Sequence, residues 1–300
     1  MNVVPMKTPQ DVKNAPAPKG FLSRFSIEVM PRTAAKISDF KEILPQGTRI
    51  YIAHIDGTPI EDMLETAARL AADGFDVMPH FPARSIADSA TLENWVERYA
   101  DIGITSALLL AGGIDTPVGA YSDSMQLMEN GVFDRFGFKR LHVAGHPEGN
   151  KDIGAEAEVM AALKWKSDFQ NRTDAKMAIA TQFVFEAAPV IDWAARMAKA
   201  DVHIPVHIGV AGPAKLQTLI KFSMACGVGP SLRVLTRRAK DFTKLLRPFA
   251  PDAVLADLAA HKAANPDFPI ESVHFFPLGG IRATTDYISA QSDPIARLRA

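Results

Sequence analysis

The sequence contains a single cysteine, Cys226, among 300 residues. One cysteine cannot form a disulfide within its own chain, and a chain without disulfides fits a reducing compartment, so we expect a cytoplasmic protein. We expect Cys226, which lies between Ala225 and Gly227, to be a small buried side chain rather than a nucleophile. The cysteine content therefore argues against a secreted, disulfide-bonded domain.

Long apolar runs are also missing. The longest, such as 107–111 and 177–180, fall far short of the roughly 18 residues that a membrane-spanning helix needs. The first 20 residues hold four prolines and scattered charges but no apolar signal-peptide core, so we expect residues 1–20 to form a flexible tail. The sequence thus predicts neither a membrane partner nor a leader peptide.

Excess charge of either sign is absent as well. The formal net charge is −1, which creates no long-range field to attract nucleic acid. The chain also has no Gly-x-Gly-x-x-Gly fingerprint after a strand and no Walker loop, so any bound nucleotide is held by other groups. With 47% hydrophobic and 22% charged residues, the composition is ordinary for a globular protein, and a small-molecule partner is the default expectation.

Eight short runs rich in β-branched and apolar residues recur along the chain, and turn residues bound them. Segments with the 3.6-residue pattern of amphipathic helices separate most of these runs. The runs cover 25–30, 48–55, 76–81, 106–112, 140–145, 176–185, 202–210 and 272–279, and the helical segments cover 59–72, 91–102, 155–168, 189–200 and 213–224. This alternation predicts one (β/α)8 TIM barrel over residues 21–300. Segment 236–265 is long enough for two helices, so we expect an extra helical insertion before the last strand.

Polar residues or glycines stand at or just past the ends of these runs. They are Glu28, His54, His80, Gly112, Gly113, His146, Gln182, Gly209, Gly279 and Gly280. Because a barrel points the C-terminal ends of its eight strands at one face, residues far apart in sequence become one candidate pocket.

Four histidines raise the question of a metal site, since His54, His80, His146 and His207 are all expected near strand ends. The first run, however, reads Ser26-Ile27-Glu28 and lacks the His-x-His pair that metal-dependent barrel hydrolases carry there. We therefore predict no catalytic metal. His142 and His274 lie inside strands, where we expect structural rather than catalytic roles.

Six segments recur in an order typical of one family: FSIEVMP at 25–31, PHF at 79–81, AGHPEG at 144–149, LKWK at 163–166, TQFVF at 181–185 and PVHIG at 205–209. Together they resemble the methylenetetrahydrofolate reductase family, which is a family of flavin-dependent (β/α)8 barrels. Two departures stand out. Leu110-Ala111-Gly112-Gly113 stands where the family has Leu-Arg-Gly-Asp, and His146 and Asn150 replace a tyrosine and a histidine.

The resemblance implies an oxidoreductase that interconverts 5,10-methylene- and 5-methyltetrahydrofolate, with FAD as cofactor and NAD(P)H as co-substrate. The residues that it implies for FAD are His80, Leu110, Ala111, Gly112, Gly113, Ala144, His146, Asn150 and Lys166. Those that it implies for the folate are Glu28, Gln182, Thr218 and Phe222, with Glu28 as the catalytic acid.

The chemistry of two of these residues agrees with the implied roles. Opening the methylene bridge requires protonation of a folate nitrogen, and Glu28 lies among apolar residues, where burial is expected to raise its pKa to suit a general acid. Gln182 offers a donor and an acceptor to the mixed polar edge of a pterin. The alternatives are an ion-paired Glu28, a structural Gln182, a solvent-exposed Lys166 and a core Phe222.

Other functions stay open at this stage. One is a folate-binding barrel that transfers the methyl group without a flavin, and a second is a folate-binding protein without turnover. A third is a flavin-free reductase that uses NAD(P)H directly. The sequence does not decide between NADH and NADPH, the physiological direction of the reaction, or whether the chain forms a homo-oligomer.

Overall fold

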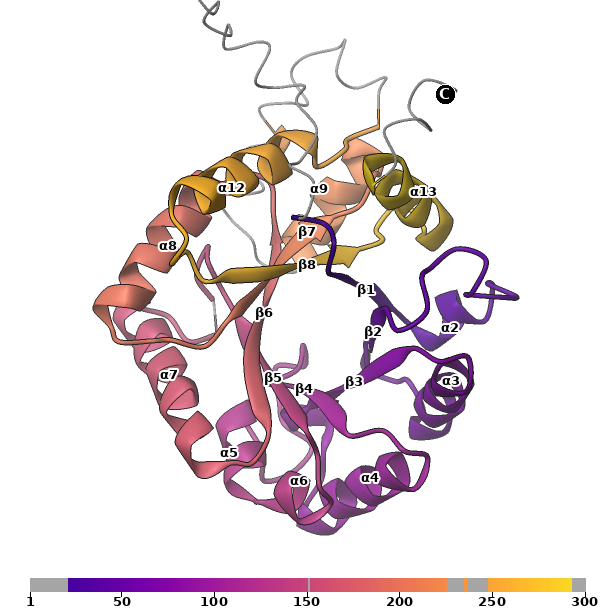
Figure 1. The fold of residues 1–300 in the computed structure, drawn as a ribbon. Helices are drawn as coiled ribbons and strands as arrows, with labels where there is room; N and C mark the ends of the chain where they lie inside the picture. The colour runs from indigo at the N-terminus through magenta and orange to yellow at the C-terminus, as the bar shows by residue number, and fades with distance from the viewer. Residues whose placement is uncertain (1–20, 151, 226–234, 237–247, 293–300) are drawn as a thin grey trace, which may run out of the picture.

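The computed structural model describes residues 21–150, 152–225, 235–236 and 248–292, and within them eight parallel strands close into a barrel in chain order (Figure 1). Each strand pairs with its neighbour in the chain, and β8 pairs with β1. The predicted (β/α)8 TIM-barrel fold is confirmed. The predicted tail at 1–20 and Cys226 lie outside the described residues.

The strands follow the predicted order with some changes in their bounds. They are β1 Phe25–Val29, β2 Arg49–Ile52, β3 Asp76–Pro82, β4 Ser106–Leu110, β5 Arg140–Gly145, β6 Lys176–Val184, β7 Val206–Ala211 and β8 Ile270–Phe276. The largest difference is at β7, predicted to begin at 202. Asp201 has a left-handed φ of 58° and Pro205 cannot donate to a ladder, so pairing begins at Val206.

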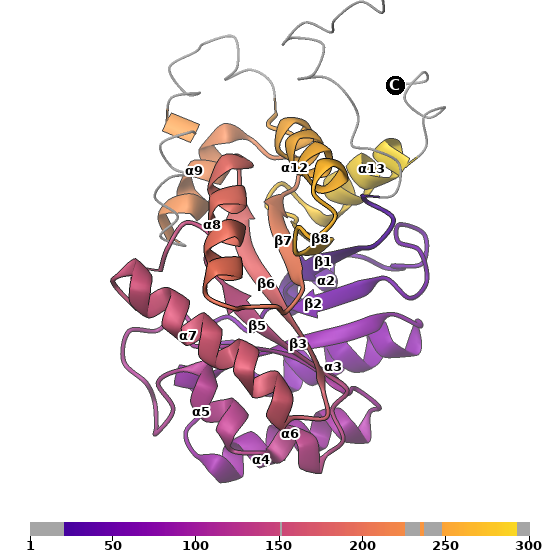
Figure 2. The same ribbon diagram turned by 60° about the vertical axis from the view of Figure 1, so that its left-hand side comes forward.

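Helices form the outer ring of the barrel (Figures 1 and 2). They are α2 Pro31–Ala34, α3 Ile60–Ala72, α4 Ser89–Asp101, α5 Ser124–Glu129, α6 Val132–Arg135, α7 Glu156–Phe169, α8 Ala188–Lys199, α9 Leu216–Ala225, α12 Asp252–Ala264 and α13 Ile281–Ser292, with short 3₁₀ helices at Ala83–Ser85 and Gln170–Arg172. Both α9 and α12 lie between β7 and β8, which confirms the extra helical insertion. No helix in the described part of the chain is long and apolar enough to cross a membrane.

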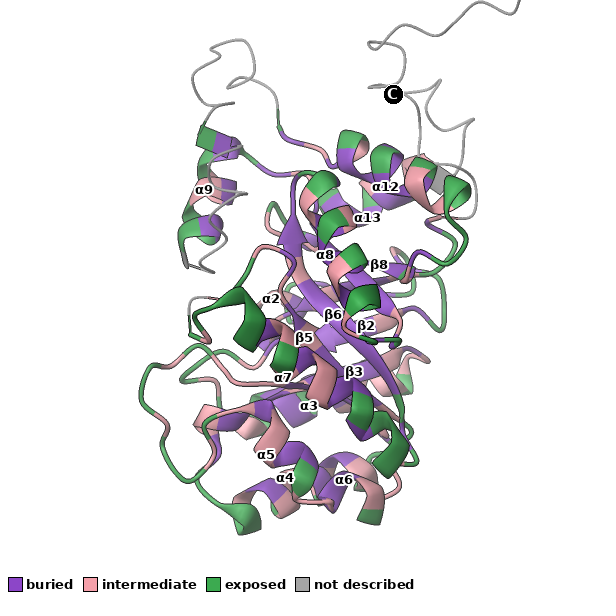
Figure 3. Ribbon diagram, turned by 90° about the vertical axis from the view of Figure 1, so that its left-hand side faces the viewer, coloured by how far each residue is buried: buried purple, intermediate pink, exposed green. Residues whose placement is uncertain are grey.

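The helix α3 shows how the sequence produces this ring. Its buried apolar residues Met63, Leu64, Ala67 and Leu70 recur at intervals of three and four, so they share the face that packs on the barrel. Burial of each large side chain contributes about 1.5–3 kcal/mol. Figure 3 shows the same division throughout, with buried strands inside and exposed residues on the outer helix faces.

The inside of the barrel is filled rather than open. Tyr51, Met78, Leu108 and Ala180, from four different strands, form one buried apolar cluster, against which Leu110 packs. Side chains from four strands therefore meet inside the barrel.

Candidate functional site

The ends of β1, β3 and β8 bring three titratable side chains together. Oε2 of Glu28 lies 3.3 Å from Nε2 of His80 and 3.6 Å from Nε2 of His274. Glu28 and His80 were expected at a common pocket, whereas His274 was expected to be structural. His274 lies next to the other two residues because the barrel closes between β8 and β1.

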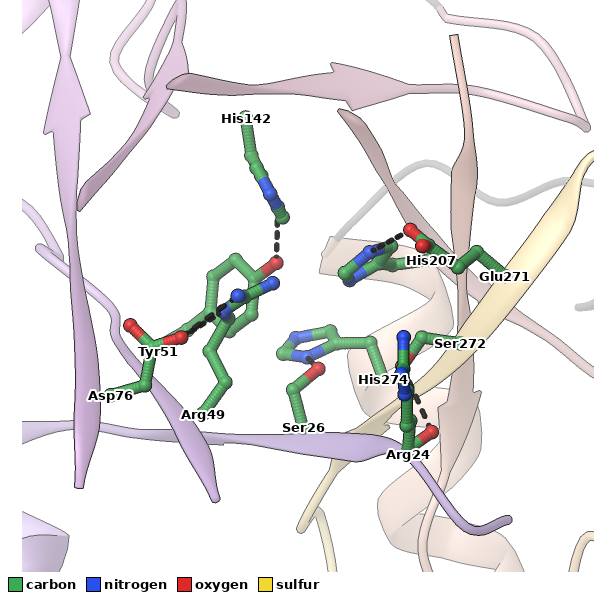
Figure 4. A network of polar contacts seen from close by, with 10 residues as sticks. All are labelled: Arg24, Ser26, Arg49, Tyr51, Asp76, His142, His207, Glu271, Ser272 and His274. Carbon is green, nitrogen blue, oxygen red and sulfur yellow. Dashed lines mark hydrogen bonds and ion pairs between the residues drawn. The ribbon is translucent and has the colours of Figure 1, made fainter. Parts of the chain in front are cut away.

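His274 is held from several sides (Figure 4). Its Nδ1 lies 2.9 Å from Oγ of Ser26, and its ring centroid lies 4.4 Å from that of Tyr51 and 4.7 Å from that of Phe276. Only 1% of the residue is exposed. The ring therefore has a fixed orientation, with its second nitrogen directed at Glu28.

The electrostatics of Glu28 differ from the expectation. Burial does raise the pKa of its carboxyl group, but contacts with His274 and His80 outweigh burial and bring the pKa down to about 2. The prediction of a raised pKa was wrong because it considered only the apolar neighbours in sequence. Glu28 is therefore ionised at neutral pH, and any proton that it donates must reach it from a neighbour.

A second polar group lies inside the barrel (Figure 4). The hydroxyl of Tyr51 lies 2.6 Å from Nδ1 of His142, and the ring of His142 makes an edge contact with that of His207 at 4.7 Å. Nε2 of His207 lies 3.3 Å from a carboxylate oxygen of Glu271. Burial lowers the pKa values of both histidines, so each is neutral at physiological pH.

His207 does not lie where the sequence analysis expected it. It is the second residue of β7, near the N-terminal end of the strand, because pairing begins only at Val206. It therefore belongs to the mouth of the barrel opposite Glu28. There the register between β7 and β8 shifts by one residue, and the extra residue is Glu271, its partner.

Gln182 owes its position to a β-bulge in β6. Ala180 pairs with His207 and Phe183 with Gly209, so β6 carries one residue more than β7 between these pairs. The hydroxyl of Thr181 accepts a hydrogen bond of 2.8 Å from the backbone N–H of Gly209 and so replaces a lost ladder contact. Bulges of this kind redirect side chains next to active sites. Gln182 is half-buried at this position.

Lys166 is the buried cation among the predicted cofactor residues. It lies on α7 with 8% of its surface exposed, and burial lowers its pKa to about 8, while the nearby charge of Asp123 raises it. No described residue forms a hydrogen bond or ion pair with its Nζ. A buried ammonium group with no partner in the described part of the chain is suited to an anion.

His146 and Asn150 lie close to this lysine. Nδ2 of Asn150 is 3.1 Å from Nε2 of His146. Burial and the charge of Lys166 lower the pKa of His146 to about 4, so the ring is neutral at physiological pH. Arg84, which the sequence analysis did not single out, adds another cation here, and its Nη1 is ion-paired with Asp152 at 3.0 Å.

The residues just after β4, Ala111, Gly112 and Gly113, present backbone groups rather than charged side chains. Gly112 has a φ of +100°, and a Cβ there would approach that of Pro82 to 3.1 Å, so glycine fits this turn. The carbonyl of Ala111 accepts from the N–H of Arg84 at 2.9 Å, and Gly113 is exposed. Ala144 of β5 is half-buried and pairs with Ala180.

Thr218 and Phe222 lie one turn apart on α9 and therefore share a face of that helix. Phe222 is exposed and Thr218 is half-buried. Their helix corresponds to the segment predicted as helical at 213–224 and precedes the predicted insertion at 236–265. The structure describes no contact of either residue with Glu28 or Gln182, so their role in binding folate stays a prediction.

Among the described residues, no group of three or more histidine, cysteine or acidic side chains is suited to hold a metal ion. His54 was one of the metal candidates. Its Nε2 lies 2.9 Å from the carbonyl oxygen of Thr58, and its ring packs on Trp95 with centroids 5.1 Å apart. This histidine therefore stabilises the loop after β2.

No family model matches the sequence, so membership of the methylenetetrahydrofolate reductase family stays a prediction. One similar solved structure is an uncharacterized protein from Clostridium thermocellum that binds two copies of 5-methyl-5,6,7,8-tetrahydrofolic acid. It has a TM-score of 0.58 and 9% identity, over 92% of this chain and 96% of that chain. At this identity the likeness shows the fold alone.

Two further structures align less well. One is the dihydropteroate synthase FolP from Thermus thermophilus, with a TM-score of 0.46 and 12% identity over 89% of this chain and 93% of that chain. The other is the catalytic domain of a mannanase from Streptomyces sp. SirexAA-E, with a TM-score of 0.43 and 16% identity over 69% of this chain and 74% of that chain.

Proposed function

We propose that this barrel binds a tetrahydrofolate derivative where β1, β3, β6 and β8 end, and interconverts 5,10-methylene- and 5-methyltetrahydrofolate with NAD(P)H through a bound flavin. The observation that carries the proposal is the carboxylate of Glu28 between the imidazoles of His80 and His274. The similar barrel that binds 5-methyltetrahydrofolic acid also supports a folate ligand.

Glu28 acts in this proposal as the group that protonates the folate nitrogen. A carboxylate with a pKa of about 2 cannot hold a proton alone at neutral pH. The Nε2 atoms of two imidazoles lie within 4 Å of this carboxylate and are the groups through which a proton can reach it. The acid is then the cluster of Glu28, His80 and His274 rather than an isolated carboxyl group.

Gln182 supplies recognition in the same proposal. Its amide can donate to the oxo side and accept from the amino side of a pterin edge. The bulge in β6 and the hydrogen bond from Gly209 to Thr181 fix the backbone on which this amide stands. A rigid backbone limits the conformational entropy lost when the ligand binds.

The residues around Lys166 fit the charged part of FAD. Lys166 would neutralise phosphate charge, and the neutral His146 and the amide of Asn150 would provide hydrogen bonds. Gly112 allows close approach of the backbone after β4. When bound, FAD would carry the reducing equivalents from NAD(P)H to the folate carbon.

A second candidate is a folate-binding barrel that works without flavin, either as a methyltransferase or as a direct NAD(P)H-dependent reductase. The observation that favours it is the segment at Ala111, Gly112 and Gly113, which offers backbone groups but no charged side chain. The same similar structure supports this candidate equally, since its ligand is the methyl form of the folate.

Two measurements test the proposal. The absorption spectrum of the purified protein, recorded before and after denaturation and after addition of FAD, should show flavin bands. Glu28→Gln should abolish folate turnover, by about 10²–10⁴-fold, while oxidation of NAD(P)H by the flavin stays nearly unchanged. Glu271→Gln, at the opposite mouth of the barrel, is the control and should preserve both half-reactions.

The outcomes separate the candidates. Protein that neither contains nor binds FAD but reduces the folate with NAD(P)H favours the flavin-free reductase. Protein that only moves the methyl group to an acceptor favours the methyltransferase. If both half-reactions fall together in Glu28→Gln, the acid role is wrong.

A further inference from the structure

His274 faces two polar side chains of β1, one through each ring nitrogen. Nδ1 lies 2.9 Å from Oγ of Ser26, and Nε2 lies 3.6 Å from Oε2 of Glu28. Ser26 and Glu28 are two residues apart on a strand, so both point into the barrel. The ring is 1% exposed and packs against the rings of Tyr51 and Phe276, so it cannot turn without losing these contacts.

The hydroxyl of Ser26 allows this ring to hold either one or two protons. A carboxylate only accepts hydrogen bonds, so Nε2 carries a hydrogen when it faces ionised Glu28, and Nδ1 then accepts from Ser26. When the ring gains a second proton, the hydroxyl rotates and accepts from Nδ1. The same neighbours therefore satisfy both protonation states of His274.

We propose that His274 is a positioning residue that supplies the proton which Glu28 passes to the folate nitrogen. This inference rests on the proposed function. The N–H bond at Nε2 breaks as an O–H bond forms at Glu28, and that O–H bond breaks as the proton moves to the nitrogen of the substrate. His274 is left neutral, with its remaining hydrogen on Nδ1, where Ser26 accepts it. No oxidation or reduction accompanies these two transfers.

His274 is better placed for this role than His80. The Nε2 of His80 is closer to Glu28, at 3.3 Å, but it makes no hydrogen bond among the described residues. His274 is hydrogen-bonded to Ser26 through Nδ1, which directs its Nε2 at Glu28, and it is enclosed by the barrel. The titratable groups that face it are Glu28 on β1, Tyr51 on β2, His80 on β3, His142 on β5 and His207 on β7.

Two substitutions separate proton supply from hydrogen bonding. His274→Gln keeps an amide N–H that can reach Glu28, but an amide takes up no proton near neutral pH. His274→Leu removes both the N–H group and the ability to take up a proton. His142→Gln is the matched control, because His142 is an equally buried histidine whose Nδ1 contacts Tyr51 and not Glu28.

The kinetic readout is the dependence of kcat on pH. Burial outweighs the contact with Glu28 and lowers the pKa of His274, so only a minor fraction of the rings carries the second proton at neutral pH. Because His274 must be protonated to supply a proton, wild-type kcat for folate reduction should fall as pH rises. In His274→Gln kcat should fall by about 10²-fold and lose this pH dependence, while KM for the folate and flavin reduction stay unchanged. His142→Gln should keep the wild-type profile. An unchanged profile in His274→Gln overturns the inference.

A second readout needs no folate and no nicotinamide. Carbon-13 NMR of labelled glutamate carboxyl groups follows the titration of Glu28, and the resonance lost in Glu28→Gln identifies it. His274→Leu should raise the midpoint toward that of an ordinary glutamate, and His142→Gln should not. An unchanged midpoint overturns the role of His274 whatever the turnover. If the midpoint rises but wild-type protein neither binds nor converts folate, the proposed function fails. The inferred transfer of the proton from Glu28 to a folate nitrogen then fails as well.

Discussion

Replacing Glu28 by glutamine should change how the stability of this protein responds to acid. In the folded protein, burial raises the pKa of Glu28, but contacts with His274 and His80 outweigh it and lower the pKa from 4.5 to about 2. One pKa unit corresponds to about 1.36 kcal/mol, so the ionised carboxylate contributes about 3 kcal/mol to the free energy of unfolding at neutral pH.

The sign of the effect follows from proton binding. Below pH 4.5 the unfolded chain takes up a proton at Glu28, whereas the folded protein does so only near pH 2. Stability from this group is therefore complete above the unfolded pKa and is lost as pH falls through the folded pKa. Linkage predicts that about 2 kcal/mol of this contribution disappears between about pH 6 and about pH 3.

Urea unfolding, followed by circular dichroism at several pH values, measures this loss in wild type and in Glu28→Gln. The free energy of the variant, subtracted from that of wild type, should shrink by about 2 kcal/mol over the same interval. Glu65→Gln, at an exposed glutamate on α3, is the reference for removal of a surface carboxyl group. If wild type and Glu28→Gln lose stability in parallel, Glu28 is not held as a carboxylate by the two histidines.

Three further predictions concern the pocket and its frame. Gln182→Leu should weaken folate binding by about 1–3 kcal/mol in titration calorimetry while FAD binding stays unchanged, because the pterin edge would lose its hydrogen-bond partners. Lys166→Ala should raise the dissociation constant of FAD by about tenfold or more, since a lost charge-assisted contact costs about 1.5–3 kcal/mol, and an unchanged constant would assign this lysine a structural role. Gly209→Ala should lower the free energy of unfolding by about 1–3 kcal/mol, because its Cβ would lie 2.5 Å from the carbonyl oxygen of Thr181, whereas Gly113→Ala meets nothing within 4 Å and should be tolerated.

The barrel could be predicted because strands and helices leave local signals. Runs of β-branched residues ended in turn residues, and β5 has the predicted bounds 140–145. Glu28, His80 and Gln182 could be proposed from their places near strand ends, since the fold directs all these ends to one face.

The partners of these residues could not be predicted in the same way. Ser26 and His274 are 248 positions apart, and no local pattern links them. Strands buried on both faces do not reveal which side faces the interior, so Tyr51 and His142 gave no sign of their contact. Ser26 and Glu28 are two residues apart, so they face the same side of β1. This spacing was the one sequence signal that could have identified β1 as a strand with polar side chains in the site. The pKa of Glu28 was predicted in the wrong direction for the same reason.

The pairing of β8 with β1 also has a consequence for how the protein is made. Ser26, Glu28 and His80 leave the ribosome early, but His274 follows only after most of the chain has been synthesised. Contacts of such high sequence separation form late and slowly, because loop-closure entropy must be overcome first. Until the last strand closes the barrel, Glu28 lacks one of its two imidazole partners, and the edges of β1 and β7 lack the backbone hydrogen bonds of β8. Nascent chains halted before β8 therefore expose two unpaired strand edges, which are the features that chaperones and aggregation exploit.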